Sequence, residues 1–140
     1  MDFDLTERQA HFRDRVRAFI EQHVRPAVPG LAAELAKGDR WHHLEGLEPL
    51  KAKAKSDGLW NLFMPPGGAL QHVDESFAFE GEQLTNLEYA LCAEEMGRIL
   101  WSAEVFNCSA PDTGNMEVLH RYGTREQKDE WLKPLMDGAI

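Results

Sequence analysis

The amino-acid sequence predicts an all-α fold of about five to six helices. Three Thr-x-x-Gln or Thr-x-x-Glu stretches, which begin at Thr6, Thr85 and Thr124, fit the capping box that opens a helix. Apolar residues at helical spacing characterise the first of these segments most clearly. No glycine-rich phosphate loop and no internal repeat is present in the sequence. We therefore expect helices joined by connecting segments.

The composition is that of a globular domain. The 140 residues are 43% hydrophobic and include seven Phe and four Trp, which is enough for a single core. The net charge of −9, from 24 acidic and 15 basic residues, argues against binding to nucleic acid or to an anionic membrane. No apolar run reaches the roughly 18–20 residues of a membrane span, so we expect no integral membrane segment.

The two cysteines, Cys92 and Cys108, form no CxxC motif and no signal peptide precedes them. This pattern favours reduced thiols over a disulfide. The acidic start Met1–Asp4 also lacks a targeting pattern. We therefore expect a cytoplasmic protein.

The first helix is expected to run from its cap at Thr6 to Pro26, where the ring should stop it. Its apolar stripe is expected to face the core and consists of Phe12, Val16, Phe19 and Ile20. A short Ala-rich helix is expected between Pro29 and Lys37. Gly38 should close it in the left-handed conformation.

The loop from Asp39 to Gly46 contains His42 and His43 beside Glu45. We predict no metal site there, because adjacent residues do not share a helical face and no third ligand stands at a useful spacing. The third helix should run from Leu47 or Pro49 to Ser56, with Leu47, Leu50 and Ala54 on its inner face and Lys51, Lys53 and Lys55 facing solvent. Gly58 should end it.

The apolar run LWNLFM, residues 59–64, is followed by two prolines and is too short for a helix. We expect it to be buried as an extended piece or a single turn. The connector from Gly67 to Gly81 is either a mobile surface loop or a lid, and the sequence does not choose between them.

A long helix capped at Thr85 is expected to continue through Leu87 and Met96 to Ile99. Glu94 and Glu95 lie one turn from Arg98. We interpret them as solvated ion pairs, ahead of any catalytic role, because nothing in the sequence indicates a cleft that would shift their pKa values.

The stretch from Ser102 to Gly123 places several polar groups in an apolar segment. Ser102 should cap a helix, which Pro111 and Gly114 should kink or break near Asp112-Thr113. The polar groups either cap and bend that helix or line a cavity. The last helix should begin at Thr124 and end at Pro134, with residues 135–138 unravelled.

Five stretches in order give the chain a family resemblance: the capped first helix, GLWNLFMP, EEMGR, FNCSAPDTGNMEVLHRYGT and EQKDEWLKPLMDG. Together they resemble the N-terminal helical domain of flavin-dependent acyl-CoA dehydrogenases. The run APDTGNMEVLH is most similar to the branch whose animal members can carry a kinase-like domain. The resemblance covers essentially the whole chain and implies one orthogonal or irregular helical bundle over residues 1–140.

The resemblance implies FAD and the α,β-dehydrogenation of acyl-CoA thioesters in the complete enzyme. It also implies a β-domain and a C-terminal helical bundle, which the chain lacks and which hold the general base and the FAD-binding segments. We therefore assign no catalytic residue and no cofactor-binding residue here. The chain alone is expected to be inactive and not to retain FAD. A complete enzyme would act in fatty acid metabolism with an electron-transfer partner and would form a homo-oligomer.

The resemblance further implies that the Ser102–Gly123 stretch runs beside the acyl chain. The implied pocket residues mix small and apolar side chains and are Phe106, Asn107, Ser109, Ala110, Pro111, Thr113 and Met116. Two alternatives stay open. In the first, the chain is a stand-alone helical protein-interaction module that has lost the chemistry. In the second, it is a small-molecule carrier with an apolar pocket.

Overall fold

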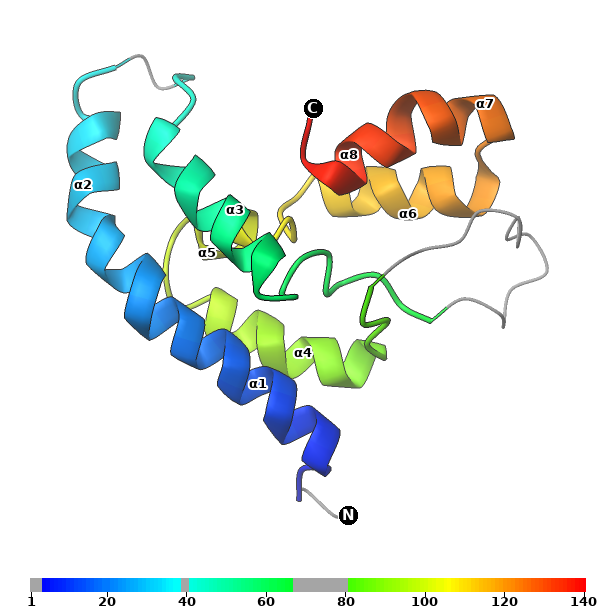
Figure 1. Ribbon diagram of the computed structural model, residues 1–140, viewed down its shortest axis with the longest axis horizontal. Helices are drawn as coiled ribbons and strands as arrows, with labels where there is room; N and C mark the ends of the chain where they lie inside the picture. The colour runs from blue at the N-terminus through cyan, green and yellow to red at the C-terminus, as the bar shows by residue number, and fades with distance from the viewer. Residues whose placement is uncertain (1–3, 39–40, 67–80) are drawn as a thin grey trace.

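The computed structural model describes residues 4–38, 41–66 and 81–140, and this part of the chain contains helices and connecting segments but no strand. The all-α prediction is therefore confirmed. Where consecutive helical stretches continue into one another, the described residues form six helical segments (Figure 1).

The first segment is a long rod made of α1 (Glu7–Phe19), the π-helical turn η1 (Ile20–Val24) and α2 (Arg25–Leu35). The predicted capping box opens it, because Gln9 N–H donates to Thr6 Oγ1 at 3.2 Å and Thr6 N–H donates to Gln9 Oε1 at 2.8 Å. The predicted apolar stripe, Phe12 to Ile20, is buried in the core.

The prediction that Pro26 ends this helix was wrong. The N–H of Arg25 bonds the carbonyl of Ile20, five residues back, so the helix is widened by one residue just before the proline. A proline normally clashes with the carbonyl four residues before it and leaves that carbonyl without a donor. The wider turn relieves this conflict, and the expected short helix from Pro29 is the second half of α2.

The next segment is η2 (Glu45–Leu47) followed by α3 (Glu48–Ser56). Helix α3 begins and ends where expected, and the 3-10 turn η2 precedes it. Gly58 has a φ of 68° and ends the segment as predicted. Gly38 does not have the expected positive φ. A Cβ added at Gly38 would come within 3.1 Å of the Cβ of His42. The close approach of His42, and not a left-handed backbone, therefore constrains this position.

The run after Gly58 is buried as predicted, with Leu62 and Met64 at most 2% exposed. It turns at Asn61, whose φ is 56°. The predicted connector from Gly67 to Gly81 lies, except for Gly81, outside the described residues.

Helix α4 (Asn86–Met96) opens with the predicted capping box at Thr85 and packs along α1 (Figure 1). It ends at Met96, short of the expected Ile99, and its Leu87 side chain is 67% exposed. The predicted pairs of Arg98 with Glu94 and Glu95 are present. The prediction that both are solvated was wrong for Glu95, whose side chain is only 6% exposed because α1 covers it.

The predicted cap at Ser102 was also wrong. Helix α5 (Ser102–Val105) is capped by Trp101, which has a φ of 71°, and Ser102 is the first residue inside it. The Ser102 hydroxyl is buried, with no hydrogen-bond partner in the described structure. A break is present but lies earlier than the predicted Asp112-Thr113: residues 106–111 leave the helix, and α6 (Asp112–Tyr122) starts after them with Gly114 inside it.

The last segment consists of α7 (Arg125–Gln127), the π-helical turn η3 (Lys128–Leu132) and α8 (Lys133–Asp137). Its capping box at Thr124 is confirmed. The predicted end at Pro134 was wrong for the same reason as at Pro26, because Lys133 N–H bonds the carbonyl of Lys128, five residues back. The helix ends at Gly138, whose φ is 69°.

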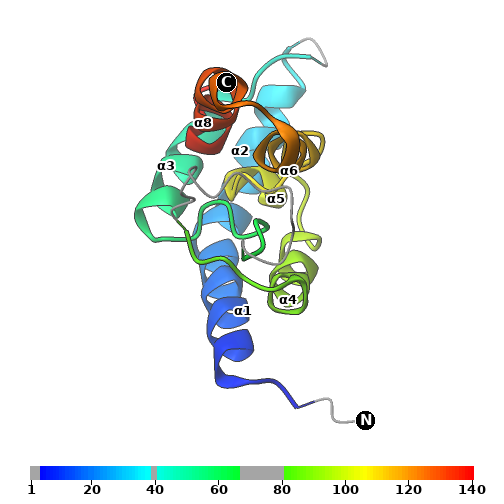
Figure 2. The same cartoon turned by 90° about the vertical axis from the view of Figure 1, so that its right-hand side faces the viewer.

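The strongest helix contacts fall into two groups. The first group is α1 to α5 with its π-helical and 3-10 turns, and the second is the hairpin of α6 with the α7–α8 segment. Figure 2 shows the hairpin at the top, away from the N-terminal end of α1. Residues of both groups, such as Phe106, Met116 and Leu132, belong to one buried core, in which the Phe106 and Phe19 rings lie 5.3 Å apart.

Candidate functional site

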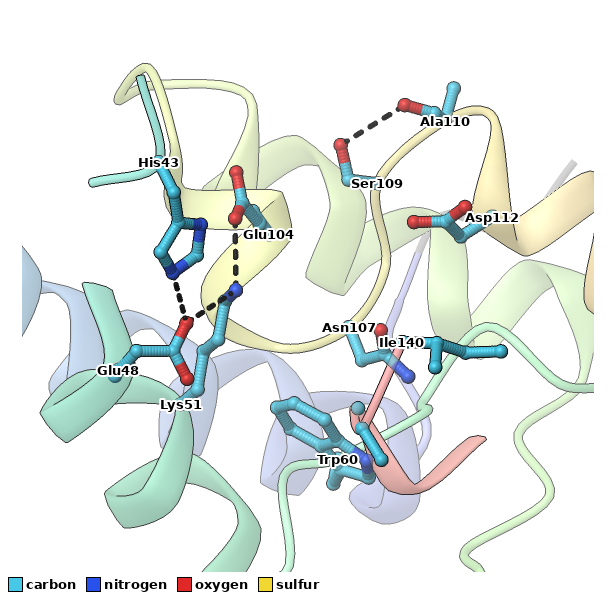
Figure 3. Close-up of a pocket in the computed structure, with 12 residues that line it drawn as sticks. His43, Glu48, Lys51, Trp60, Glu104, Asn107, Ser109, Ala110, Asp112 and Ile140 are labelled. Atoms are coloured by element: carbon cyan, nitrogen blue, oxygen red, sulfur yellow. Dashed lines mark hydrogen bonds and ion pairs between the residues drawn. The ribbon is translucent and has the colours of Figure 1, made fainter. Parts of the chain in front are cut away.

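A pocket of about 540 Å³ lies where the two helix groups meet (Figure 3). One side is formed by the loop before α3, by α3 and by α5. The other is formed by the turn after α5 and by the residues that follow α8. The lining residues are His43, Glu48, Lys51, Trp60, Glu104, Asn107, Ser109, Ala110, Asp112, Gly138, Ala139 and Ile140.

The turn of residues 106–111 gives this pocket its small side chains. It doubles back at Asn107, which has a φ of 55°, and the Cys108 N–H bonds the carbonyl of Ala103 at 2.9 Å. The peptide bond between Ala110 and Pro111 is cis. Ser109 and Ala110 follow the bend and line the pocket together (Figure 3).

A chain of ion pairs crosses the pocket wall (Figure 3). Lys51 Nζ lies 3.0 Å from Glu48 Oε1 and 2.9 Å from Glu104 Oε1, and His43 Nε2 lies 3.0 Å from Glu48 Oε1. Partial burial would lower the pKa of Lys51, but its hydrogen bonds to Glu104 and Glu48 outweigh burial and raise it. The hydrogen bond from Lys51 lowers the pKa of Glu48. Lys51 and Glu48 are therefore both charged, and Lys51 ties α3 to α5.

A second polar cluster holds the end of α8. Asn107 Nδ2 donates to Asn61 Oδ1 at 2.7 Å and to the Leu135 carbonyl at 3.0 Å. The Met136 carbonyl accepts from Asn61 Nδ2 at 2.9 Å and from Trp60 Nε1 at 2.7 Å. The Leu135 carbonyl also accepts from the Gly138 N–H, whereas the Met136 carbonyl is bonded by these side chains at the helix end, where carbonyls lack partners within the helix.

The two free thiols do not line the pocket. Cys92 and Cys108 are unpaired, as predicted, and both are buried. Burial raises the pKa of Cys92 to about 11 and that of Cys108 to about 12. Both thiols are therefore protonated at neutral pH, and neither is a ready nucleophile.

The structure brings together part of the implied pocket set. Asn107, Ser109 and Ala110 line the pocket. Phe106 and Met116 are fully buried in the core beside it. Pro111 and Thr113 lie next to lining residues in the sequence but do not line the pocket themselves.

Sequence reasoning missed the rest of the lining, which comes from distant segments. Trp60 was expected only to be buried, and Lys51 was expected on the solvent-exposed face of its helix. Gly138 belonged to an expected unravelled end. A lysine on a polar helix face gives no sign that carboxylates of two helices will enclose it.

Other kinds of site find no support among the described residues. No three His, Cys, Asp or Glu side chains there are grouped so that they could hold a metal ion. His42 and His43 instead face Glu34 and Glu48, respectively. Within the same ranges, none of the helices combines the length and apolar character needed to cross a bilayer.

Residues 6–139 match the family model described as acyl-CoA dehydrogenase, N-terminal domain. The chain is 52% identical to acyl-CoA dehydrogenase family member 10 of Mus musculus, over 87% of this chain and 11% of that protein. It is 48% identical to family member 11 of Gallus gallus, over 90% of this chain and 15% of that protein.

A solved structure of a provisionally assigned acyl-CoA dehydrogenase from Mycobacterium abscessus is similar, with a TM-score of 0.82 and 44% identity. The match covers 99% of this chain and 33% of that one. The chain thus spans a third or less of the length of these relatives.

Proposed function

This chain belongs to the acyl-CoA dehydrogenase family, whose N-terminal domain it matches over residues 6–139, and we propose that it forms one wall of an acyl-CoA dehydrogenase site. The family match over nearly the whole chain is the observation that carries this proposal. The reaction is the α,β-dehydrogenation of an acyl-CoA thioester. The chain shapes the acyl end of the site and excludes water from it.

The pocket at the junction of the two helix groups supports this role. Ser109 and Ala110 leave room there, and Trp60 and Ile140 add apolar surface to a lining that is otherwise mostly polar. Phe106 is buried behind the turn. We propose that the acyl chain passes along the 106–111 turn and the start of α6, and that the seven residues named above for this stretch shape its path. Phe106 and Met116, which are buried, would support this path from behind without contacting the acyl chain.

The pocket does not fit FAD by itself. A flavin dinucleotide carries a diphosphate, which needs cationic side chains or free backbone N–H groups. Lys51 is the one Lys or Arg among the described lining residues, and two carboxylates already bind it. With Glu48, Glu104 and Asp112 also in the lining, the pocket would repel an anion. We therefore propose that FAD is bound only in the complete enzyme.

The remaining parts of the proposal concern that complete enzyme. Residues 1–140 act as a single helical domain within it, and the proton acceptor and the flavin-binding segments come from other domains. We propose a cytoplasmic homo-oligomer that passes electrons from acyl-CoA to an electron-transfer partner in fatty acid metabolism.

Two measurements test the proposal. The chain purified alone should carry no flavin and should not reduce a dye with acyl-CoA. A chimera in which residues 6–139 replace the matching part of the Mycobacterium abscessus protein should bind FAD and reduce the dye when acyl-CoA is added. The unaltered relative serves as the control.

Either of two results would contradict the proposal. One is a yellow 140-residue chain with stoichiometric FAD that oxidises acyl-CoA unaided. The other is a chimera that folds and binds FAD but is inactive with every acyl-CoA that its parent oxidises.

A further inference from the structure

Asn61 and Asn107 occupy the junction between the two helix groups. Asn61 lies in the turn after α3, and Asn107 lies in the turn after α5. The main chain links these turns, because Asn61 N–H donates to the carbonyl of Phe106 at 3.1 Å. The side chains then reach across to α8 in the other group.

The side-chain nitrogens of both residues and the side-chain oxygen of Asn61 have defined hydrogen-bond partners. The Asn61 oxygen accepts from Asn107, so the Asn61 amide nitrogen faces the Met136 carbonyl. Both amide hydrogens of Asn107 are used, one on Asn61 and one on Leu135. Asn61 is only 6% exposed, and loss of a partner from such a buried network is costly.

The backbone at both residues is in the left-handed region, with φ values of 56° and 55°. Asn tolerates this conformation better than other residues with a side chain, apart from Asp. Gly would also adopt it but would bring no amide. The two positions therefore combine a left-handed turn with a side-chain amide.

The pair also controls the end of α8 that lines the pocket. Trp60 Nε1 shares the Met136 carbonyl with Asn61, and Gly138 lies against the Trp60 ring, where an added Cβ would come within 2.7 Å of Cζ2. The other polar link from α3 to α8, between Lys55 and Asp137, is exposed and contributes little. The amide pair and Trp60 thus make the less exposed polar contacts to the end of α8, which residues 138–140 follow.

We propose that Asn61 and Asn107 are positioning residues that hold the end of α8 against the 106–111 turn and so set the width of the pocket. Asn61 does this without lining the pocket. That the pocket receives an acyl group rests on the function proposed above, whereas the polar joint can be tested without any ligand.

The test uses the 140-residue chain labelled with ¹⁵N and the variants Asn61→Gly and Asn107→Gly. Glycine keeps the left-handed turn and removes only the amide. Gln83→Gly is the matched control, because Gln83 also has a positive φ, of 49°, and does not line the pocket. Hydrogen exchange is followed at the Gly138 and Ala139 amides, at the Trp60 indole, and at core amides of α1 and α4.

In both Asn variants we expect the Gly138 and Ala139 amides and the Trp60 indole to exchange about tenfold faster or more, with the α1 and α4 amides unchanged relative to Gln83→Gly. The backbone resonances of Ser109 and Ala110 should also shift. Asn61→Asp keeps the acceptor for Asn107 but sets a carboxylate oxygen against the Met136 carbonyl, so it should accelerate exchange at least as much as Asn61→Gly.

The proposal is overturned if exchange at Gly138 and at the Trp60 indole is unchanged in both Asn variants. It is equally overturned if all amides accelerate together, because the pair would then support the fold as a whole and not the pocket end of α8. Neither result bears on whether the family reaction takes place, since no flavin or acyl-CoA is present.

Discussion

Glu95 joins α1 to α4 through a carboxylate that is almost entirely buried. Arg17 Nη2 lies 2.7 Å from Glu95 Oε1, and Arg98 Nε lies 3.3 Å from Oε2. The hydrogen bond from Arg17 is the main reason that the pKa of Glu95 is lowered, against the opposing effect of burial. The carboxylate therefore stabilises the fold at a pH above its pKa in the unfolded chain. This contribution is lost as pH falls through the lower pKa of the folded state.

Replacement of Glu95 by Gln should lower the free energy of unfolding at pH 7 by about 1–3 kcal/mol, because Arg17 loses its charged partner. The loss relative to the parent chain should shrink as pH falls below the pKa of an ordinary glutamate toward the lowered pKa of Glu95, because the parent then loses the same stabilisation. Urea unfolding at pH 7 and at pH 3.5 measures both effects. Glu94→Gln is the control: Glu94 also pairs with Arg98 but is 66% exposed, so we expect a change within about 0.5 kcal/mol. Equal losses in the two variants would contradict this account.

The polar residues after Ser102 show how far single positions could be interpreted from the sequence. Asn107 both lines the pocket and satisfies a helix carbonyl, so the two interpretations of this stretch are not exclusive. Ser102 does neither. What separates them is the left-handed turn at Trp101, which moves the helix start by one residue, and no local sequence pattern indicates that turn.

At the level of elements, the helix starts were predictable and the helix ends at proline were not. A capping box is a local contact between residues three apart, and all three predicted boxes are formed. The two prolines were misjudged because a π-helical turn precedes each of them. Such a turn is stabilised by what its wider face buries, such as Val24 and Leu132, and this depends on distant packing.

The π-helical turns predict an unusual tolerance at these prolines. Pro26→Ala and Pro134→Ala should each change the free energy of unfolding by less than about 1 kcal/mol, because neither ring clashes with the preceding turn. Ala32→Pro, at an exposed position inside α2 with no widened turn before it, should cost about 3 kcal/mol. Thermal and urea unfolding of the three variants provide the comparison. A large gain in stability on removal of Pro26 would show that the ring strains the rod after all.

At the level of the whole molecule, the pocket arises because two helix groups meet around one core. Its walls come from residues as far apart in the sequence as His43 and Ile140. The family resemblance pointed to the Ser102–Gly123 wall, since that wall is one continuous stretch. The lining residues after α8 could not be predicted, because their place depends on the packing of α8 against the turn at Trp60, which the sequence pattern does not encode locally.

This arrangement predicts how the pocket should respond to filling. Ala110 lines it from the 106–111 turn, so Ala110→Leu should narrow the path along that turn without removing any hydrogen bond made by its side chain. In the chimera described above, kcat/KM should fall about tenfold or more for long acyl-CoAs and change little for short ones, since a few methylene groups in a pocket are worth about 1–3 kcal/mol. Val118→Leu, at a position on α6 that is 59% exposed and outside the lining, is the control and should leave the chain-length preference unchanged. If Ala110→Leu lowered activity equally for all chain lengths, Ala110 would affect the fold of the turn and not the depth of the acyl pocket.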